Sequence, residues 1–245
     1  MDVFVSWSGG KDCTLSCYRA RIAGHNIRRL ATMSTIELGR MYPHHLTSDV
    51  LECQAKAMDI PLTVTWTMSH EYTDNYIKML QGFRREGITG GVFGDVSLGN
   101  ADMDEHLQWV QHVCKAADME VLLPLWDQDR TSIISELLDV GFKAMIIAAD
   151  NNQLGNNWIG KIMDWEMLAE LKSLHDNSPD GHVGLYHTLT VDGPLFKQQL
   201  QVLESEIIFK EYGLLDGKPT RCPFWYLDVK NCALSEKPEP VSTMH

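Results

Sequence analysis

The residues with the clearest chemical potential are five consecutive ones near the N-terminus, Ser8-Gly9-Gly10-Lys11-Asp12. They follow the apolar run Val3-Phe4-Val5 and precede a helix-like segment, so the order is strand, glycine turn and helix N-terminus. Two glycines remove the Cβ atoms that would keep an anion away from the backbone N–H groups. Lys11 adds a mobile positive charge. The pattern therefore predicts a phosphate cradle.

This cradle differs from the loop of the usual kinases and GTPases, which reads G-x-x-x-x-G-K-S/T. Val5 stands where the first glycine of that pattern would be, and Asp12 follows the lysine. A plain strand-to-helix turn with Asp12 as its N-cap is the alternative interpretation.

Composition limits the kind of protein. The 245 residues are 44% hydrophobic, enough for one large α/β domain, or one with a small appendage. With 21 Lys and Arg against 33 Asp and Glu, the net charge of −12 disfavours a nucleic-acid partner. Neither a bilayer-length apolar run nor a signal peptide is visible, and the six cysteines form no C-x-x-C pair. We expect a cytoplasmic protein with free thiols, without a nucleic-acid or membrane partner.

Apolar runs alternate with helical periodicity up to about Leu174, as in a parallel sheet covered on both faces. The expected strands are Asp2 to Ser6, Arg28 to Met33, Leu62 to Thr67, Gly91 to Asp95, Val121 to Pro124 and Ala144 to Ala149. The expected helices are Asp12 to Ala23, Ser48 to Met58, Tyr72 to Glu86, Asp104 to Ala117, Arg130 to Val140 and Met163 to Leu174. Six β-α units predict a doubly wound α/β fold.

The pattern changes after Leu174, where a turn-rich stretch leads into short strand-like runs. We expect a nucleotide domain over residues 1–174, a small mixed C-terminal lobe over 175–234 and a flexible tail over 235–245.

In an open parallel sheet, ligands bind beyond the carboxyl ends of the strands. Gly94-Asp95 follows one expected strand, where the carboxylate would hold Mg²⁺ or steer a nucleophile; bracing of the loop is the alternative. Asp12 likewise has two alternative roles, as a metal ligand or as the N-cap of the helix. Cys13 is either a thiol activated by the helix N-terminus or a small side chain that fits.

Other candidates lie in segments that follow strands. His44 belongs to a long segment that suits a lid or substrate loop, and Trp126 either lines the site or packs at its rim. The polar, glycine-containing loop from Asp150 to Lys161 is placed for substrate selection.

The pentapeptide resembles the PP-loop of the N-type ATP pyrophosphatases, which split ATP between its α and β phosphates and transfer AMP. The whole chain is similar to the diphthine–ammonia ligase branch of that group, by motifs that run in order to about Lys197. These motifs are Gly94-Asp95-Val96, Val113-Cys114, Pro124-Leu125-Trp126, Gly141-Phe142-Lys143-Ala144, Trp158-Ile159-Gly160-Lys161 and the run from Tyr186 to Phe196.

The resemblance implies that ATP adenylates the carboxylate of diphthine on elongation factor 2 and that ammonia displaces AMP to give an amide. The implied cofactors are ATP and Mg²⁺, with Lys11, Asp12 and Asp95 as catalytic residues and both aspartates at the metal. Nucleotide contacts are assigned to Ser6, Ser8, Gly9, Gly10, Lys11, Asp12, Met33 and Gly94. The acceptor side is assigned to His44, Trp126, Trp158, Tyr186, His187 and Thr188. A homodimer is left open.

The chain departs from that branch before Tyr186, where the branch usually shows Gly-Glu-x-Gly-Glu. His182 and Leu185 replace the two glutamates. Alongside the ligase, two further hypotheses therefore stand: the same adenylating core with a different acceptor, and a nucleotide-binding regulator without ligase activity.

Overall fold

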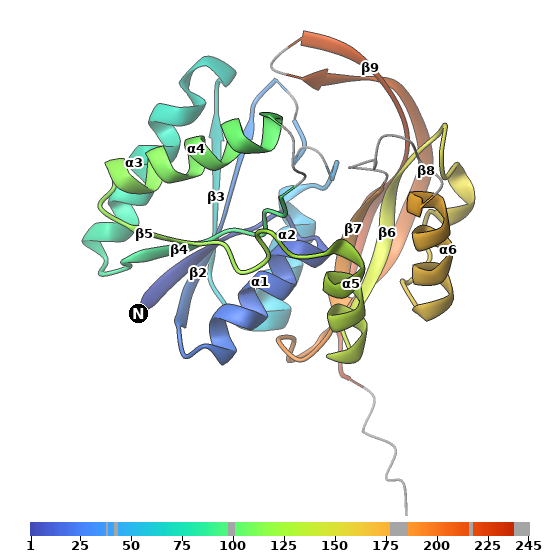
Figure 1. Ribbon diagram of the computed structural model, residues 1–245, viewed down its shortest axis with the longest axis horizontal. Helices are drawn as coiled ribbons and strands as arrows, with labels where there is room; N and C mark the ends of the chain where they lie inside the picture. Colours follow the sequence, from blue (N-terminus) through green and yellow to red (C-terminus); the bar gives the residue numbers. More distant parts are fainter. Residues whose placement is uncertain (38, 42–43, 98–100, 177–185, 216–217, 238–245) are drawn as a thin grey trace, which may run out of the picture.

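Two sheets organise the chain, one parallel and one antiparallel (Figure 1). The computed structural model describes residues 1–37, 39–41, 44–97, 101–176, 186–215 and 218–237. Within these ranges, no helix combines the length and the apolar character needed to cross a membrane.

The parallel sheet has five strands in the order β3-β2-β1-β4-β5. They are β1 (Asp2–Ser6), β2 (Asn26–Thr35), β3 (Leu62–Thr67), β4 (Gly90–Val92) and β5 (Glu120–Leu122). The chain runs outward from β1 to β3 and then returns to place β4 on the other side of β1. The strand order therefore reverses between β1 and β4, the place where doubly wound sheets bind ligands. The loops after β1 and β4 carry the phosphate cradle and Gly94-Asp95, so the fold brings both predicted sites to one crevice.

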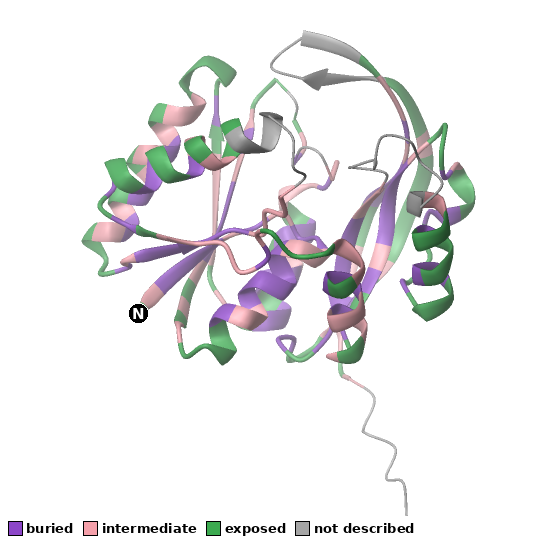
Figure 2. Ribbon diagram, viewed as in Figure 1, coloured by how far each residue is buried: buried purple, intermediate pink, exposed green. Residues whose placement is uncertain are grey.

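Helices cover both faces of this sheet, as predicted (Figure 1). One face carries α1 (Lys11–Ile22) and α2 (Ser48–Met58); the other carries α3 (Tyr72–Arg85), preceded by the 3₁₀ turn η1 (Ser69–Glu71), and α4 (Ala101–Ala116). Strand β1 shows why. Val3 and Val5 point to the α1 side, while Phe4 packs on Phe83 of α3 at 5.5 Å between ring centroids. This alternation buries β1 on both faces (Figure 2).

The antiparallel sheet has the order β7-β6-β9-β8. Its strands are β6 (Lys143–Asp150), β7 (Tyr186–Asp192), β8 (Gln199–Leu215) and β9 (Lys218–Ser235). Beside it lie α5 (Arg130–Asp139) and α6 (Trp165–Asp176), which contact each other, and the 3₁₀ turn η2 (Asn156–Trp158) follows β6.

One strand assignment from the sequence was wrong. The segment from Ala144 to Ala149 was expected as the sixth strand of the parallel sheet, but β6 pairs antiparallel with both β7 and β9. Its apolar run reads like a buried parallel strand because β6 is central in its own sheet, and Ile146 and Ile147 are both fully buried. Burial on two faces is a property of central strands in either kind of sheet. The second sheet consequently begins with β6, before residue 174.

The two sheets are joined through α1 and α2, and a buried glutamine secures the junction. Gln54 of α2 accepts a hydrogen bond from the Trp7 indole at 3.0 Å. Its amide nitrogen donates to the carbonyl oxygens of Gly9, at 2.9 Å, and of Thr190 in β7, at 2.6 Å. The side chain is fully buried, so these bonds meet no competition from water. One residue thus links α2, the phosphate loop and the second sheet.

Replacing Gln54 by leucine should destabilise the protein by about 2–4 kcal/mol, because the Trp7 N–H and the Thr190 carbonyl would remain buried without a partner. Urea unfolding followed by circular dichroism measures this change. Gln108→Leu, on the exposed side of α4, is the matched control and should stay within about 0.5 kcal/mol of wild type. Equal midpoints for the two variants would contradict the role given to Gln54.

Candidate active site

The phosphate loop connects β1 to α1 through two glycines, and each position requires glycine for a different steric reason. Gly9 has φ of 82°, a left-handed conformation that side chains rarely adopt. Gly10 is the N-cap of α1, and a Cβ atom there would lie 2.6 Å from Cε1 of His44. The helix begins at Lys11, so Asp12 lies in its first turn. The alternative of Asp12 as N-cap is therefore wrong; its carboxylate instead faces the positive end of the helix dipole.

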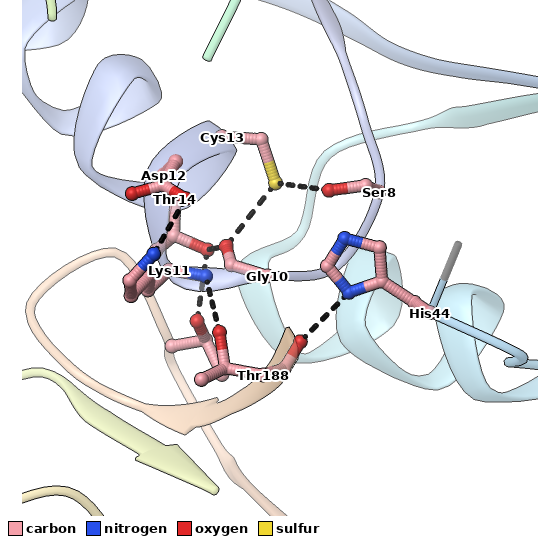
Figure 3. A network of polar contacts seen from close by, with 9 residues as sticks. Ser8, Gly10, Lys11, Asp12, Cys13, Thr14, His44 and Thr188 are labelled. Atoms are coloured by element: carbon pink, nitrogen blue, oxygen red, sulfur yellow. Dashed lines mark hydrogen bonds and ion pairs between the residues drawn. The ribbon is translucent and has the colours of Figure 1, made fainter. Parts of the chain in front are cut away.

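Strand β7 holds this loop from the other side (Figure 3). The Thr188 hydroxyl accepts a hydrogen bond from the backbone N–H of Lys11 at 2.9 Å. The Thr14 hydroxyl donates to the Gly10 carbonyl at 2.8 Å and lies 3.1 Å from the Thr190 hydroxyl. The backbone N–H of Thr190 donates to the Gly9 carbonyl at 2.9 Å. The loop is thus fixed by contacts with both sheets before any ligand arrives.

The charged group at the loop is Lys11. Its ammonium lies 2.7 Å from the Asp12 carboxylate and 5.2 Å from the centroid of the Tyr186 ring. Burial opposes the charged form, but the charge of Asp12 and its hydrogen bond, together with Tyr186, raise the pKa of Lys11 above its ordinary value. Lys11 is therefore a permanent cation at neutral pH.

Asp95 stands after β4, beside the loop. Its position depends on Gly94, because a Cβ atom on that residue would lie 2.6 Å from the backbone nitrogen of Cys13. The Asp95 carboxylate lies 3.0 Å from Nε2 of His106, and this hydrogen bond raises the pKa of His106. The carboxylate is thus braced from α4 while still lining the cavity.

An aromatic wall extends from His106, formed by Tyr72, Tyr76 and Trp109. The Trp109 ring stacks on His106 at 5.8 Å between centroids and meets the edge of Tyr76 at 4.9 Å. Its indole N–H donates to the Thr73 hydroxyl at 3.0 Å. A flat apolar surface with its polar atoms already bonded suits the face of a planar ring.

Two histidines form a second wall of the site. The rings of His44 and His187 lie 4.9 Å apart, and Nδ1 of His44 lies 3.0 Å from the Thr188 carbonyl oxygen. That carbonyl can only accept, so Nδ1 of His44 carries the proton. Burial lowers the pKa of His44 to about 4 and that of His187 well below its usual range. Both imidazoles are neutral at physiological pH.

These groups surround one cavity of about 610 Å³. It brings together twelve of the residues assigned from the sequence: Ser6, Ser8, Gly10, Lys11, Asp12, Met33, His44, Gly94, Asp95, Tyr186, His187 and Thr188. A cavity of this size accommodates a nucleotide with room for a second reactant.

Comparison with known proteins places this cavity in a family. The diphthamide synthase N-terminal domain matches residues 1–121, and the diphthamide synthase C-terminal domain matches residues 129–220. The chain belongs to the diphthamide synthase family. The first match ends within β5 and the second begins one residue before α5, so the boundary lies where the chain leaves the parallel sheet.

Curated relatives named diphthine–ammonia ligase agree with this membership. The chain is 25% identical to the Schizosaccharomyces pombe protein over 96% of its own length but spans only 40% of that protein. It is 26% identical to the human protein and 25% identical to the Bos taurus protein, covering 82% and 92% of them. A solved structure of a predicted tRNA methyltransferase subunit from Methanocaldococcus jannaschii aligns over 79% of this chain and 98% of that one. Its TM-score of 0.43 and 18% identity are too low to bear on fold or function.

Three assigned residues do not line the cavity of this family member. Gly9 lies in the phosphate loop, but its carbonyl faces Gln54 and β7. Trp126 lies after β5, outside the lining, and Trp158 is buried in the core beside β6. The loop from Asp150 to Lys161, expected to select substrate, also contributes nothing to the lining. The reason is the sheet change, since the carboxyl end of β6 does not share an edge with β1 and β4.

Cys13 is not an activated thiol, because burial raises its pKa above the ordinary value despite its hydrogen bond with Ser8. The alternative of a small side chain that fits is the one the structure favours: its sulfur lies 3.2 Å from the Gly10 carbonyl in a buried position. His182 and Leu185, where the sequence departs from the ligase branch, lie outside the described residues.

Sequence reasoning did not assign the aromatic wall of the cavity, which consists of Tyr72, Tyr76, His106 and Trp109. The spacing of these residues was a signal for them. Tyr72 and Tyr76 are four residues apart in α3, and His106 and Trp109 are three apart in α4, so each pair lies on one face of its helix. Sequence reasoning also missed Arg130, whose position depends on how α5 packs.

The neutral His44 should make the protein less stable in acid. In the unfolded chain this side chain takes up a proton near pH 6.5, but in the folded chain only near pH 4, so stability falls as pH drops through that window. His44→Asn should flatten this dependence by up to about 1.4 kcal/mol per pH unit. Urea unfolding from pH 7 to 4 measures it, with His112→Asn on the exposed side of α4 as control. A parallel pH profile for wild type and His44→Asn would refute the assignment.

Proposed function

We propose that this protein is an ATP-dependent ligase that forms AMP and pyrophosphate, adenylating a carboxylate that ammonia then converts to an amide. One observation carries the proposal: Lys11 at the phosphate loop and Tyr186-His187-Thr188 on β7 line the same cavity. The first belongs to the nucleotide motif and the second to the family signature in the other sheet. Adenylation requires a nucleotide and an acceptor in one enclosure, which this arrangement supplies.

The nucleotide would enter with its phosphates at the loop and its base toward the aromatic wall. Lys11 supplies charge, and the Ser8 hydroxyl is a further donor. Ser6 and Met33 lie against the wall, since the Tyr76 hydroxyl is 3.5 Å from that of Ser6 and the Tyr72 hydroxyl is 3.4 Å from the Met33 carbonyl. In the chemical step the acceptor carboxylate attacks the α phosphorus, and the bond to the pyrophosphate oxygen breaks. Positive groups at the loop stabilise the charge that accumulates there.

Mg²⁺ fits the acidic residues of this cavity. Among the described residues no group of three or more His, Cys, Asp or Glu side chains could hold a metal alone. Mg²⁺ at nucleotides usually has one or two carboxylate ligands besides phosphate oxygens and water. Asp12 and Asp95 line the same cavity and match that mode. When bound, the ion would neutralise phosphate charge.

The acceptor proposed first is diphthine, which the name of the curated relatives contains. Its location on elongation factor 2 is what the resemblance of the sequence motifs implies. The acceptor side is the wall of His44 and His187. A neutral imidazole nitrogen accepts a hydrogen bond from ammonia, whose lone pair then attacks the acyl carbon as AMP leaves. Lys11 close to this wall disfavours ammonium and so favours the reactive neutral form.

A second candidate is the same adenylating reaction on a different carboxylate. It is favoured by His182 and Leu185, which stand where the ligase branch has glutamates. Leucine cannot replace a carboxylate in binding a cation or ammonia. Localisation in the cytoplasm and the absence of a nucleic-acid partner remain part of the proposal, and a homodimer remains open.

Lys11→Met should reduce AMP formation by about 100-fold or more, because the variant keeps the stem of the side chain and removes the charge at the phosphates. The assay is ATP labelled at the α phosphate, with diphthine-bearing elongation factor 2, other carboxylates and ammonia. Lys78→Met, on exposed α3, is the control. Labelled ADP in place of AMP, or unchanged turnover in Lys11→Met, would refute the proposed reaction.

Asp95→Asn should raise the Mg²⁺ concentration needed for half-maximal AMP formation, since an amide oxygen binds Mg²⁺ more weakly than a carboxylate. A Mg²⁺ titration of the labelled-ATP assay measures this shift. Asp118→Asn removes an exposed carboxylate that pairs with Arg84 and should leave the titration unchanged. A variant with lower turnover at every Mg²⁺ concentration but an unshifted midpoint would show that Asp95 serves His106 and not the metal.

A further inference from the structure

Two cations that the sequence did not indicate, Arg130 and Lys172, line the cavity in addition to Lys11. Arg130, the first residue of α5, lines it together with Lys11, Asp12 and Tyr186. It lies outside the parallel sheet and outside the phosphate loop.

Contacts at the start of α5 and along it hold Arg130 in place. Asp129 caps α5, because its carboxylate accepts hydrogen bonds from the backbone N–H of Ser132 at 2.7 Å and from the Ser132 hydroxyl at 3.0 Å. Further along α5, Glu136 forms an ion pair with Arg19 of α1, with 3.1 Å between Nε of Arg19 and Oε1 of Glu136. Arg19 also donates to the carbonyl of Pro124, in the segment between β5 and α5, at 2.6 Å.

These ties make α1 and α5 neighbours with their N-termini at the cavity. Lys11 opens α1 and Arg130 opens α5, and the two helices contact each other. Both helix dipoles therefore present their positive ends to the same space. Figure 1 shows the two helices side by side.

Arg130 differs from Lys11 in that no carboxylate among the described residues pairs with it directly. The ammonium of Lys11 is 2.7 Å from the Asp12 carboxylate, so that pair is close to neutral. The guanidinium of Arg130 forms no hydrogen bond or ion pair with any residue that the structure describes, although it is partly buried. Burial lowers the pKa of Arg130, and the charge of Asp12 opposes that change. A guanidinium held in a cavity without a partner is ready for an anionic ligand.

We propose that Arg130 binds the β and γ phosphates of ATP and holds the pyrophosphate as it leaves. This inference rests on the proposed function. As the acceptor oxygen bonds to the α phosphorus, the electron pair of the breaking bond moves to the pyrophosphate oxygen. The planar guanidinium donates two parallel N–H bonds to phosphate oxygens, which lysine cannot do. Lys11 thereby contacts the phosphates at the loop, while Arg130 contacts the β and γ phosphates.

The test compares ligands that carry or lack these phosphates. Isothermal titration of the full chain, in buffer with Mg²⁺, gives the affinities for ATP, pyrophosphate and AMP. Arg130→Gln should weaken ATP and pyrophosphate about 10- to 100-fold and leave AMP within about twofold. Arg130→Lys keeps the positive charge but loses the two parallel N–H donors. Its affinities for ATP and pyrophosphate should lie between those of wild type and Arg130→Gln. Arg85→Gln, an exposed arginine at the end of α3, should leave all three affinities unchanged.

Retained AMP binding shows that the variant is folded. Equal weakening of AMP and ATP would overturn the inference, because the contact would then be with the α phosphate or the nucleoside. Unchanged ATP and pyrophosphate affinities in Arg130→Gln would also overturn it. The binding comparison needs no turnover, so it decides the role of Arg130 even if wild type forms no AMP; that second result would refute the proposed function separately.

Discussion

The junction between the phosphate loop and strand β7 is the contact on which the site depends. A glycine turn is the least constrained kind of backbone, and its two carbonyls and first helical N–H would otherwise be free to move. Here the Gly9 carbonyl is held by both Gln54 and Thr190, and the Lys11 N–H is held by Thr188. Without β7 the loop would still be a turn, but its groups would lack a fixed direction.

Because of this junction, residues from both sheets form the site. The nucleotide motif and the family signature are more than 170 residues apart in the sequence, yet Lys11 and Thr188 are joined by one hydrogen bond, with a sequence separation of 177. A mutation in β7 can therefore disturb the phosphate loop directly. The His44 ring, seated on Gly10 and bonded to the Thr188 carbonyl, is a third part of this contact.

The cavity is less acidic than the molecule as a whole. The chain has a net charge of −12, whereas the cavity lining balances three cations, Lys11, Arg130 and Lys172, against three carboxylates, Asp12, Asp95 and Asp129. An acidic exterior repels polyanions such as nucleic acids, whereas the helix N-termini and cations at the cavity attract a small phosphate ligand locally. Salt screens charges over about 8–10 Å, so the acidic exterior does not cancel the attraction for phosphate inside the cavity.

The sequence by itself determined the local parts: the strand, glycine turn and helix around Lys11, the expectation of a carboxylate after β4, the alternating helices and strands through β5, and the family. Those features depend on periodicity, on glycine and on short ordered motifs, which neighbouring residues specify. Tertiary structure alone decided that β6 leaves the parallel sheet, that Trp126 and Trp158 lie away from the cavity, and that Arg130 faces it. The physical reason is that a strand's apolar pattern records how deeply it is buried but not which strand it pairs with. Likewise, the direction of Arg130 depends on the pairing of Arg19 with Glu136, a contact between helices that no local pattern encodes.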